Sequence, residues 1–408
     1  MAALLLLASS CDRRPAGEAV IELRFWNGFT GPDGRTMLAM VRRFNESHPG
    51  IRVTMQRMDW ATYYNKLFVA GRGGRTPDLF VVHTETLPRL RAGGFVRAID
   101  DLTGPGKLDA SDIDPNVWQA SSHDGRHFGV PIDIHLDGMF YNRKLFRDAG
   151  IVDEHGEPKP PTNRQEFLDA VRKLRATGPE NWGFVFTWLR NNAYCLMRQH
   201  GGDVMDAKGR VTLDTPENAA ALAFLRGLVN DGVAPTPENY DAWVGFLQGR
   251  VGIAFEGIYM LPDLRRQADL DYGAAPLPTL GDQPAAHASS HNVCVRADLS
   301  GKELDAASLF VKYLSDNSLD WADGGQVPVR RSLRDTDRFR AMKAQSAFAK
   351  QIPAAAYYPA SPYVFEYEQE MDFAVERVLK GRLTAEAALK QAATAVDRVI
   401  DRNREATP

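Results

Sequence analysis

The chain has 408 residues, of which 44% are hydrophobic, and a formal net charge of -3. A single core is not expected at this length, so two separately packed lobes are predicted. The charge is close to neutral and no polybasic run occurs, which argues against nucleic acid as a partner.

The first 19 residues are predicted to be a targeting segment and a tether. Residues 2–8 form an apolar run, shorter than the about 20 residues of a membrane-spanning helix, and Cys11 follows it. This pattern is typical of the end of a secretion signal. Residues 7–11 also resemble a bacterial lipobox, which implies acylation of Cys11 and a lipid-anchored, extracytoplasmic protein. An ordinary secretory signal with an incidental cysteine is the alternative.

Strand and helix patterns then alternate along the chain. Strands are predicted over residues 20–26, 51–55 and 76–82, and helices over 37–45 and 63–70. This alternation predicts a parallel sheet with helices on its faces. Ligands of such sheets bind beyond the carboxyl ends of the strands, which places residues 26–28 and 83–85 on one rim.

Residues 124–142 carry the prediction of two lobes. They begin with an Asp-Gly turn, pass through Pro131 as an extended chain, and include Asp133 and His135 among apolar residues. A strand with polar residues at these positions suits a crossing between lobes better than a core. We therefore expect a hinge here, with Asp133 or His135 facing a ligand; a histidine satisfied by backbone groups is the alternative. Residues 290–295 are the predicted return crossing.

The rest of the chain predicts further strands and helices. Strands are expected over residues 182–188 and 249–255, and helices over 305–314, 372–379 and 385–403. Thr162 and Gln165 predict a capping box at one helix start, and Thr215 begins another helix. Cys195 and Cys294 are expected to be buried free thiols, with a disulfide as the alternative, and no Cys/His spacing indicates zinc.

With these pieces placed, the chain resembles the extracellular solute-binding proteins of carbohydrate-uptake ABC transporters, the maltose-binding-protein-like family. The segments that carry the resemblance are 44–53 (FNESHPGIRV), 76–79 (TPDL), 124–131, 140–146 (FYNRKLF), 201–202, 246–254 (FLQGRVGIA), 276–278, 324–330 (GGQVPVR) and 383–389 (LTAEAAL). The resemblance implies an α/β, two-lobed periplasmic-binding-protein fold of type II. Each lobe is then a mostly parallel sheet flanked by helices, and crossing hinge segments join the lobes. One lobe comprises residues 20–131 and 285–330, and the other 132–284 and 331–408.

Sugars bind through apolar faces that stack on aromatic rings and through hydroxyls that hydrogen-bond to carboxylates, amides and Arg. Loops rich in such side chains are costly if they face a dry core. The candidate ligand-binding residues are Trp26, Asn27, Thr30, Glu85, Asp133, His135, Trp188, Arg190, Asn191, Glu256, Gly257, Tyr259, His291, Asn292 and Arg330.

Several of these residues also have a structural interpretation. Trp26 suits a core position, Glu85 suits a helix cap, and Arg330 suits an exposed surface. Arg190 and Arg330 are the residues expected to contact a phosphate or an acidic sugar.

The resemblance implies the substrate-binding component of a carbohydrate ABC import system. It would capture a sugar or sugar derivative by hinge closure and deliver it to a membrane permease, as a monomer without cofactor or metal. A binder of glycerol phosphate or its diesters and a sugar-sensing partner are the alternatives. A glycosidase would need two facing carboxyls, for which Glu85 and Asp133 are the candidates. No nucleophile elbow, phosphate loop, metal helix or dinucleotide fingerprint occurs, so an enzyme is not expected.

Overall fold

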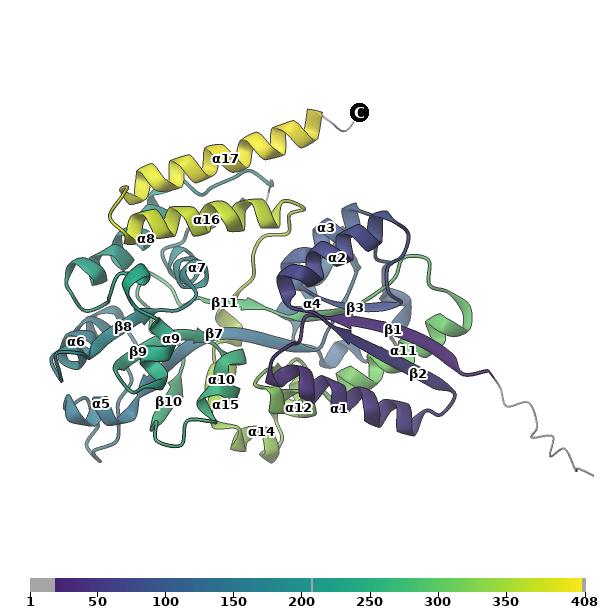
Figure 1. Cartoon of the computed structure of the whole chain (residues 1–408), viewed down its shortest axis with the longest axis horizontal. Helices are drawn as coiled ribbons and strands as arrows, with labels where there is room; N and C mark the ends of the chain where they lie inside the picture. The colour runs from purple at the N-terminus through teal and green to yellow at the C-terminus, as the bar shows by residue number, and fades with distance from the viewer. Residues whose placement is uncertain (1–18, 207, 406–408) are drawn as a thin grey trace, which may run out of the picture.

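The computed structural model describes residues 19–206 and 208–405, which form two α/β lobes arranged along the long axis of the molecule (Figure 1). The first lobe contains a five-stranded sheet in the order β2-β1-β3-β12-β6. Its strands are β1 (Ile21–Asn27), β2 (Ile51–Arg57), β3 (Leu79–His83), β6 (Val130–Pro131) and β12 (His291–Val295). As predicted, β1 is parallel to β2 and β3, whereas β12 is antiparallel to β3 and β6.

Helices cover both faces of this sheet. On one face of β3, Leu79 and Val81 belong to the same core cluster as residues of α1 and α11. On the other face, Phe80 and Val82 pack with residues of α2 and α3. A strand that is buried on both sides has to be apolar throughout, which explains the apolar run in the sequence. The helices of this lobe are α1 (Pro32–Ser47), α2 (Trp60–Arg72), α3 (Leu87–Ala92), α4 (Pro115–Ala120) and α11 (Gly301–Asp316).

The second lobe is built on a sheet in the order β14-β11-β7-β9-β8, and β10 and β13 also pair with β7. These strands are β7 (Asp133–Asn142), β8 (Trp182–Phe186), β9 (Val251–Gly257), β10 (Tyr272–Ala275), β11 (Ala286–Ser289), β13 (Val327–Pro328) and β14 (Ala355–Ala356). A separate hairpin joins β4 (Ser122–His123) and β5 (Arg126–His127).

The prediction of a mostly parallel sheet is wrong for this lobe. β8 is parallel to β9 and β11 is parallel to β14, but β7 is antiparallel to β9, β10, β11 and β13. The reason is that β7 enters from the first lobe. β11 leads back toward the first lobe through β12, so it has to run in the direction opposite to β7.

Most of the remaining helices surround the second sheet or lie beneath the crossing strands (Figure 1). They are α5 (Arg143–Asp148), α6 (Arg164–Arg175), α7 (Leu189–Gln199), α8 (Pro216–Asn230), α9 (Ala242–Leu247), α10 (Leu261–Leu264), α12 (Ser318–Trp321), α13 (Arg331–Arg334), α14 (Asp337–Ala341), α15 (Lys343–Ala349), α16 (Val364–Leu379) and α17 (Ala385–Glu405). Among the described residues, no helix combines the length and the hydropathy needed to cross a membrane.

Side-chain caps start several helices, and one of them differs from the predicted cap. Asn142 accepts a hydrogen bond from the backbone N–H of Leu145 at 3.1 Å, and Thr215 caps α8. The predicted capping box at Thr162 is displaced by one residue. Asn163 is the cap of α6, because its amide oxygen reaches the N–H of Glu166, and Glu166 accepts from the N–H of Thr162 at 2.9 Å.

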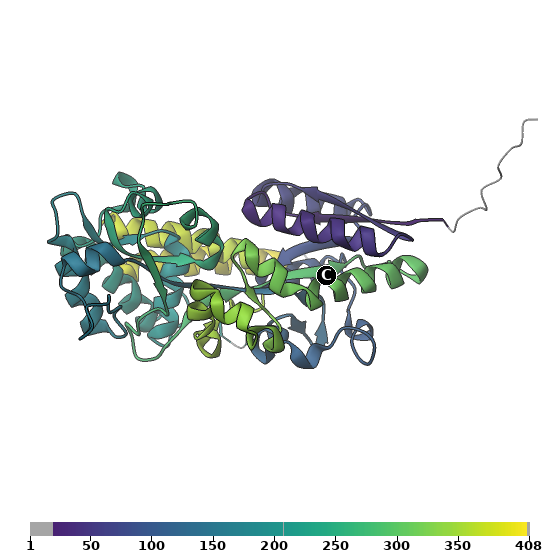
Figure 2. The ribbon, with the colours of Figure 1, turned by 90° about the horizontal axis from the view of Figure 1, so that it is seen from below.

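Two segments cross between the lobes, as predicted (Figures 1 and 2). The first is β6 followed by β7, which is buried along its whole length. The second is β11 followed by β12, where Ser289 pairs with His135 of β7 and His291 pairs with His83 of β3. Cys195 and Cys294 are free and buried, which confirms the prediction of two thiols.

Candidate ligand-binding site

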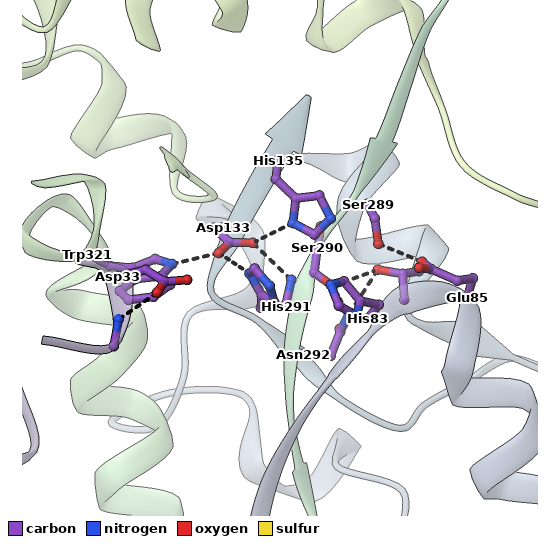
Figure 3. Close-up of polar contacts among 12 residues, drawn as sticks. Asp33, His83, Glu85, Asp133, His135, Ser289, Ser290, His291, Asn292 and Trp321 are labelled. Carbon is purple, nitrogen blue, oxygen red and sulfur yellow. Dashed lines mark hydrogen bonds and ion pairs between the residues drawn. The ribbon is translucent and has the colours of Figure 1, made fainter. Parts of the chain in front are cut away.

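Polar side chains of the two crossing segments meet between the lobes (Figure 3). The carboxylate of Asp133 is fully buried and accepts hydrogen bonds from the backbone N–H of His291 at 2.9 Å, from Nδ1 of His291 at 2.6 Å and from Nε1 of Trp321 at 2.6 Å. Nδ1 of His135 lies 3.7 Å from the same carboxylate. We call Asp133, His135, His291 and Trp321 the floor of the site. Burial alone would raise the pKa of Asp133, but His291 and His135 hold it well below its ordinary value.

A third imidazole, from the first lobe, lies beside the floor. The ring of His83 is 5.0 Å from that of His291 and 5.4 Å from that of His135, measured between centroids. Nδ1 of His83 lies 2.6 Å from the hydroxyl of Tyr64 on α2. Burial, followed by the neighbouring His291 and His135, lowers the pKa of His83 well below its ordinary value. His83 is therefore neutral at pH 7, when it can accept or donate one hydrogen bond at each ring nitrogen.

Two hydrogen bonds at the edge of the floor join the end of β3 to the return crossing, and they involve Glu85 and Asn292. Ser289 donates a hydrogen bond to Glu85 Oε2 at 2.6 Å, so Glu85 contacts the return crossing and does not cap a helix through its side chain. Asn292 is fully buried and donates to Thr84 Oγ1 at 2.9 Å. This contact ties the return crossing to the end of β3.

The wall that the second lobe contributes contains Trp188 and Arg190 at the start of α7. Trp188 is 51% exposed and packs edge-on to the ring of Tyr259, at 6.1 Å between centroids. The Tyr259 ring lies 6.2 Å from that of His135, so these rings connect the wall to the floor. Gly257 permits this position of Tyr259, because a Cβ there would lie 2.0 Å from its ring.

Arg190 is paired with carboxylates of α16. Its guanidinium forms ion pairs with Asp372 and, at 3.6 Å, with Glu368. Burial would lower the pKa of Arg190, but Tyr358, Glu368 and Asp372 raise it on balance. Burial also raises the pKa of Glu368 to about 7, although Arg190 opposes that shift. The cation of the wall is therefore already paired with two acidic side chains.

Glu256 lies beneath this wall and is almost fully buried. Its Oε1 accepts a hydrogen bond from the N–H of Gly257 at 2.8 Å, and burial raises the pKa of its carboxyl to about 8. A groove of about 370 Å³ opens beside it, lined in part by Trp188, Tyr240 and Trp243. This groove offers aromatic faces next to a hydrogen-bonding carboxyl.

The structure does not bring every candidate to the floor. Trp26 is half-buried and packs against the core cluster that contains Tyr63 and Leu67 of α2, with Lys66 Nζ 4.9 Å from its ring centroid, which favours the structural interpretation of this residue. Arg330 pairs with Asp112 at 2.8 Å and with Asp316, and not with the side chains of the floor. Arg330 is thereby held by two carboxylates of the first lobe, which the sequence pattern does not reveal.

The other candidates outside the floor and wall differ in burial. Asn27 is fully buried and accepts a hydrogen bond from the N–H of Phe29 at 3.3 Å. Thr30 is exposed, Asn191 is half-buried, and among the described residues neither side chain forms a hydrogen bond. Cys11 lies outside the described residues.

The fold brings several further residues to this region that are not among the candidate ligand-binding residues. They are Asp33, Tyr64, His83, Tyr358, Glu368 and Asp372. A signal existed for His83, which ends β3 on the predicted rim, and for Tyr358, which lies in an aromatic-rich stretch. No pattern connects Glu368 with Arg190, because they are far apart in the chain and meet only when α16 packs against α7.

Comparisons with known proteins agree with this architecture. The chain is 25% identical to a binding protein of Brucella abortus (strain 2308), over 97% of this chain and 96% of that protein. The ABC substrate-binding protein Lmo0181 from Listeria monocytogenes, solved in complex with cycloalternan, has a TM-score of 0.80 at 21% identity and covers 94% of this chain and 99% of its own. UgpB from Mycobacterium tuberculosis, solved in complex with glycerophosphocholine, has a TM-score of 0.82 at 21% identity, with 94% and 99% covered.

The family model described as bacterial extracellular solute-binding protein matches residues 29–318, which is more than half of the chain. Members of this family bind substrates and are not enzymes, which agrees with the sequence prediction. The family is also extracytoplasmic. The two-lobed fold, the crossing segments and this match together show that the chain belongs to the bacterial extracellular solute-binding proteins.

Proposed function

We propose that this protein is the substrate-binding component of an ABC import system and captures a neutral carbohydrate between its lobes. The observation that supports this most is the meeting of hydrogen-bonding and aromatic side chains from three sources. Glu85 comes from the first lobe, His135 from a crossing strand, and Trp188 and Tyr259 from the second lobe. Rings and carboxylates in this combination suit the apolar faces and the hydroxyls of a sugar.

The charge of the site favours a neutral ligand over a phosphate. Arg190 and Arg330 were the predicted phosphate contacts, and each is already paired with two carboxylates. A phosphate at Arg190 would have to displace Asp372 or Glu368, or add a further negative charge beside them. A glycerophosphodiester, the ligand of the UgpB relative, is therefore the second candidate.

Capture by hinge closure is supported by contacts that join the lobes at their outer edge. Arg89 of α3 lies 3.1 Å from Glu366 of α16, and Phe365 packs edge-on to Tyr64 and Phe68 of α2. We call these five residues the lip. Contacts of this kind are available only when the lobes are closed, so a ligand that bridges the lobes shifts the population toward the closed form.

The boundaries of the lobes and the partners follow from this proposal. The first lobe comprises residues 20–131 and 285–330 and the second 132–284 and 331–408, except that β11 and β13 pair into the sheet of the second lobe. The closed form presents one surface to a membrane permease. The protein acts as a monomer, with Cys11 acylated as the mature N-terminus and residues 12–19 serving as the tether. A sugar-sensing partner protein would use the same site, and loss of uptake on gene deletion distinguishes import from sensing.

A thermal-shift screen tests the ligand class. Neutral mono-, di- and oligosaccharides form one arm, and glycerol 3-phosphate and glycerophosphocholine form the other. A ligand at a hundred times its Kd stabilises the protein by about 2.7 kcal/mol, so a true ligand raises the Tm clearly. Stabilisation only by the phosphate arm would overturn the neutral class.

Two variants test the location of the site. Glu85→Ala and Trp188→Ala are expected to weaken binding of the ligand found in the screen without lowering the Tm of the ligand-free protein. Phe373→Ala is the matched control, since Phe373 is an exposed aromatic residue (41%) of α16 that is not part of the lip, floor or wall. Unchanged affinity in both test variants would place the site elsewhere.

A further inference from the structure

Three donors of the floor cluster around one carboxylate, which is more than the single sugar contact assigned to His135 requires. Asp133, His135 and His291 each offer one ligand atom, and these atoms all lie within 4.8 Å of one another. The three side chains are 0%, 6% and 4% exposed. Figure 3 shows His135 and His291 on two sides of the Asp133 carboxylate.

A purely structural role explains only part of this group. Asp133 and His291 form a satisfied pair, in which the carboxylate accepts from Nδ1 and from the backbone N–H of His291. His135 is different: its Nδ1 is buried, faces the same carboxylate at 3.7 Å, and has no hydrogen-bond partner within the described residues. A buried polar atom without a partner is costly, so this nitrogen calls for an explanation.

We propose that Asp133, His135 and His291 bind one divalent transition-metal ion, with Zn²⁺ as the best match. Two imidazoles and one carboxylate are borderline donors that suit Zn²⁺ and its neighbours better than Mg²⁺ or Ca²⁺. Two donors on a tetrahedral ion with metal–ligand bonds of about 2.0–2.1 Å lie about 3.3 Å apart. The distances from the carboxylate to Nδ1 of His291 (2.6 Å) and of His135 (3.7 Å) lie on either side of this separation.

Neighbouring residues hold these three side chains in place, as outer hydrogen-bond partners do for metal ligands. Trp321 Nε1 donates to Asp133 and fixes its carboxylate, as an outer partner of a metal ligand does. The backbone of His135 is held by its pairing with Ser289, and that of Asp133 by its pairing with Pro328. Because the backbone is held, small side-chain movements are enough for the ion to replace the hydrogen between Nδ1 of His291 and the Asp133 carboxylate.

His83 is the nearest further imidazole and supplies a fourth donor. Its ring is 5.0 Å from that of His291, its Nδ1 is held by Tyr64, and its Nε2 has no hydrogen-bond partner among the described residues. Because His83 belongs to β3 of the first lobe, the ion links that lobe to both crossing segments. The proposal does not depend on which sugar, if any, the protein binds.

Calorimetry with the metal alone tests the proposal. The chelator-treated full-length protein is titrated with ZnCl₂ without sugar, and one ion per chain is expected to bind, with a rise in Tm. Loss of a residue that only supports a metal ligand typically weakens metal affinity by about 10- to 100-fold. His135→Gln and His291→Gln each remove a ligand, so they are expected to weaken Zn²⁺ binding by more than this. His83→Gln weakens it less, and His155→Gln, a change at a ring that is 78% exposed, leaves it unchanged.

A spectroscopic readout on the unmodified protein keeps the test independent of how the variants fold. One equivalent of Co²⁺ is expected to give the visible absorption of a tetrahedral nitrogen- and oxygen-bound ion. Absence of both this absorption and Zn²⁺ binding would overturn the proposal. Equal Zn²⁺ affinity of well-folded His135→Gln, His291→Gln and His155→Gln proteins would also overturn it, because the ion would then bind elsewhere on the surface.

Discussion

The floor and the lip both join the lobes, but they do so by different means. In the floor, buried side chains hydrogen-bond to one carboxylate of a crossing strand. Backbone pairing of β7 with β11 and β13, and of β12 with β6, holds them in place. In the lip, half-buried side chains on helices of different lobes touch one another, and no strand pairing supports them. The floor is therefore part of the fold, whereas the lip depends on how far the lobes have closed.

This difference separates two kinds of mutational effect. Changes in the floor are expected to act mainly on the free energy of unfolding, because they leave buried polar groups without partners. Changes in the lip are expected to act mainly on ligand affinity, because they remove contacts that only the closed form makes.

Replacing Asp133 should have the largest effect. In Asp133→Ala, Nδ1 of His291 and Nε1 of Trp321 lose their acceptor in a buried environment, so the free energy of unfolding is expected to fall by about 3–5 kcal/mol. Urea denaturation measures this. Asp298→Ala, at an aspartate that is 77% exposed, should change stability by less than about 0.5 kcal/mol. Similar losses in both proteins would remove the distinction between floor and surface.

Glu256 should make stability depend on pH. Its backbone pairs with Gly138 of β7, next to the floor, and the folded protein raises its pKa to about 8 from an ordinary value of 4.5. The folded state therefore holds this proton more tightly than the unfolded state does, and its stabilising effect is lost as the pH rises from about 4.5 to 8.

The Glu256→Gln protein should lack this loss. As the pH is raised from 5 to 9, the unfolding free energy of the variant minus that of the unmodified protein should increase by on the order of 3 kcal/mol. Chemical denaturation at pH 5, 7 and 9 measures the difference. A constant difference across this range would mean that Glu256 titrates normally in the folded protein.

Phe365→Ala should show how the lip acts. The ring of Phe365 packs edge-on to Tyr64 at 5.6 Å and to Phe68 at 6.0 Å, and aromatic pairs contribute about 0.5–1.5 kcal/mol each beyond the area they bury. Ligand affinity is expected to fall about 3- to 10-fold, since 1.4 kcal/mol corresponds to tenfold. Calorimetry with the ligand from the screen measures this. An unchanged Kd together with a large loss of stability would make the lip a structural contact like the floor.

Glu366→Gln should have the smallest effect. It removes the partner of Arg89 in a half-buried ion pair, for which a contribution of about 0–1 kcal/mol is typical. Affinity should fall less than about fivefold, and the difference from the unmodified protein should shrink as salt is raised. Glu370→Gln, one helical turn further along α16, is the matched control and should bind normally.

The local elements were largely predictable, because they depend on neighbours in the chain. The alternation of Leu23 and Phe25 with exposed residues identified β1, and Asn142 and Thr215 capped the helices that follow them. The capping box at Thr162 was displaced by one residue, since Asn163 offers an equivalent side-chain acceptor. The mixed order of the second sheet was not predicted, because strand direction depends on where a crossing strand enters.

What the sequence by itself determined is the two-lobed architecture, the crossing at residues 124–142 and the residue types available at strand ends. Periodicity, turns and caps act over a few residues, so a single sequence records them. Tertiary structure alone decided which polar groups meet: Asp133 with His291, Arg190 with Glu368, and Arg330 with Asp112. These partners are far apart in the chain, and the packing that brings them together also sets their charge and their burial.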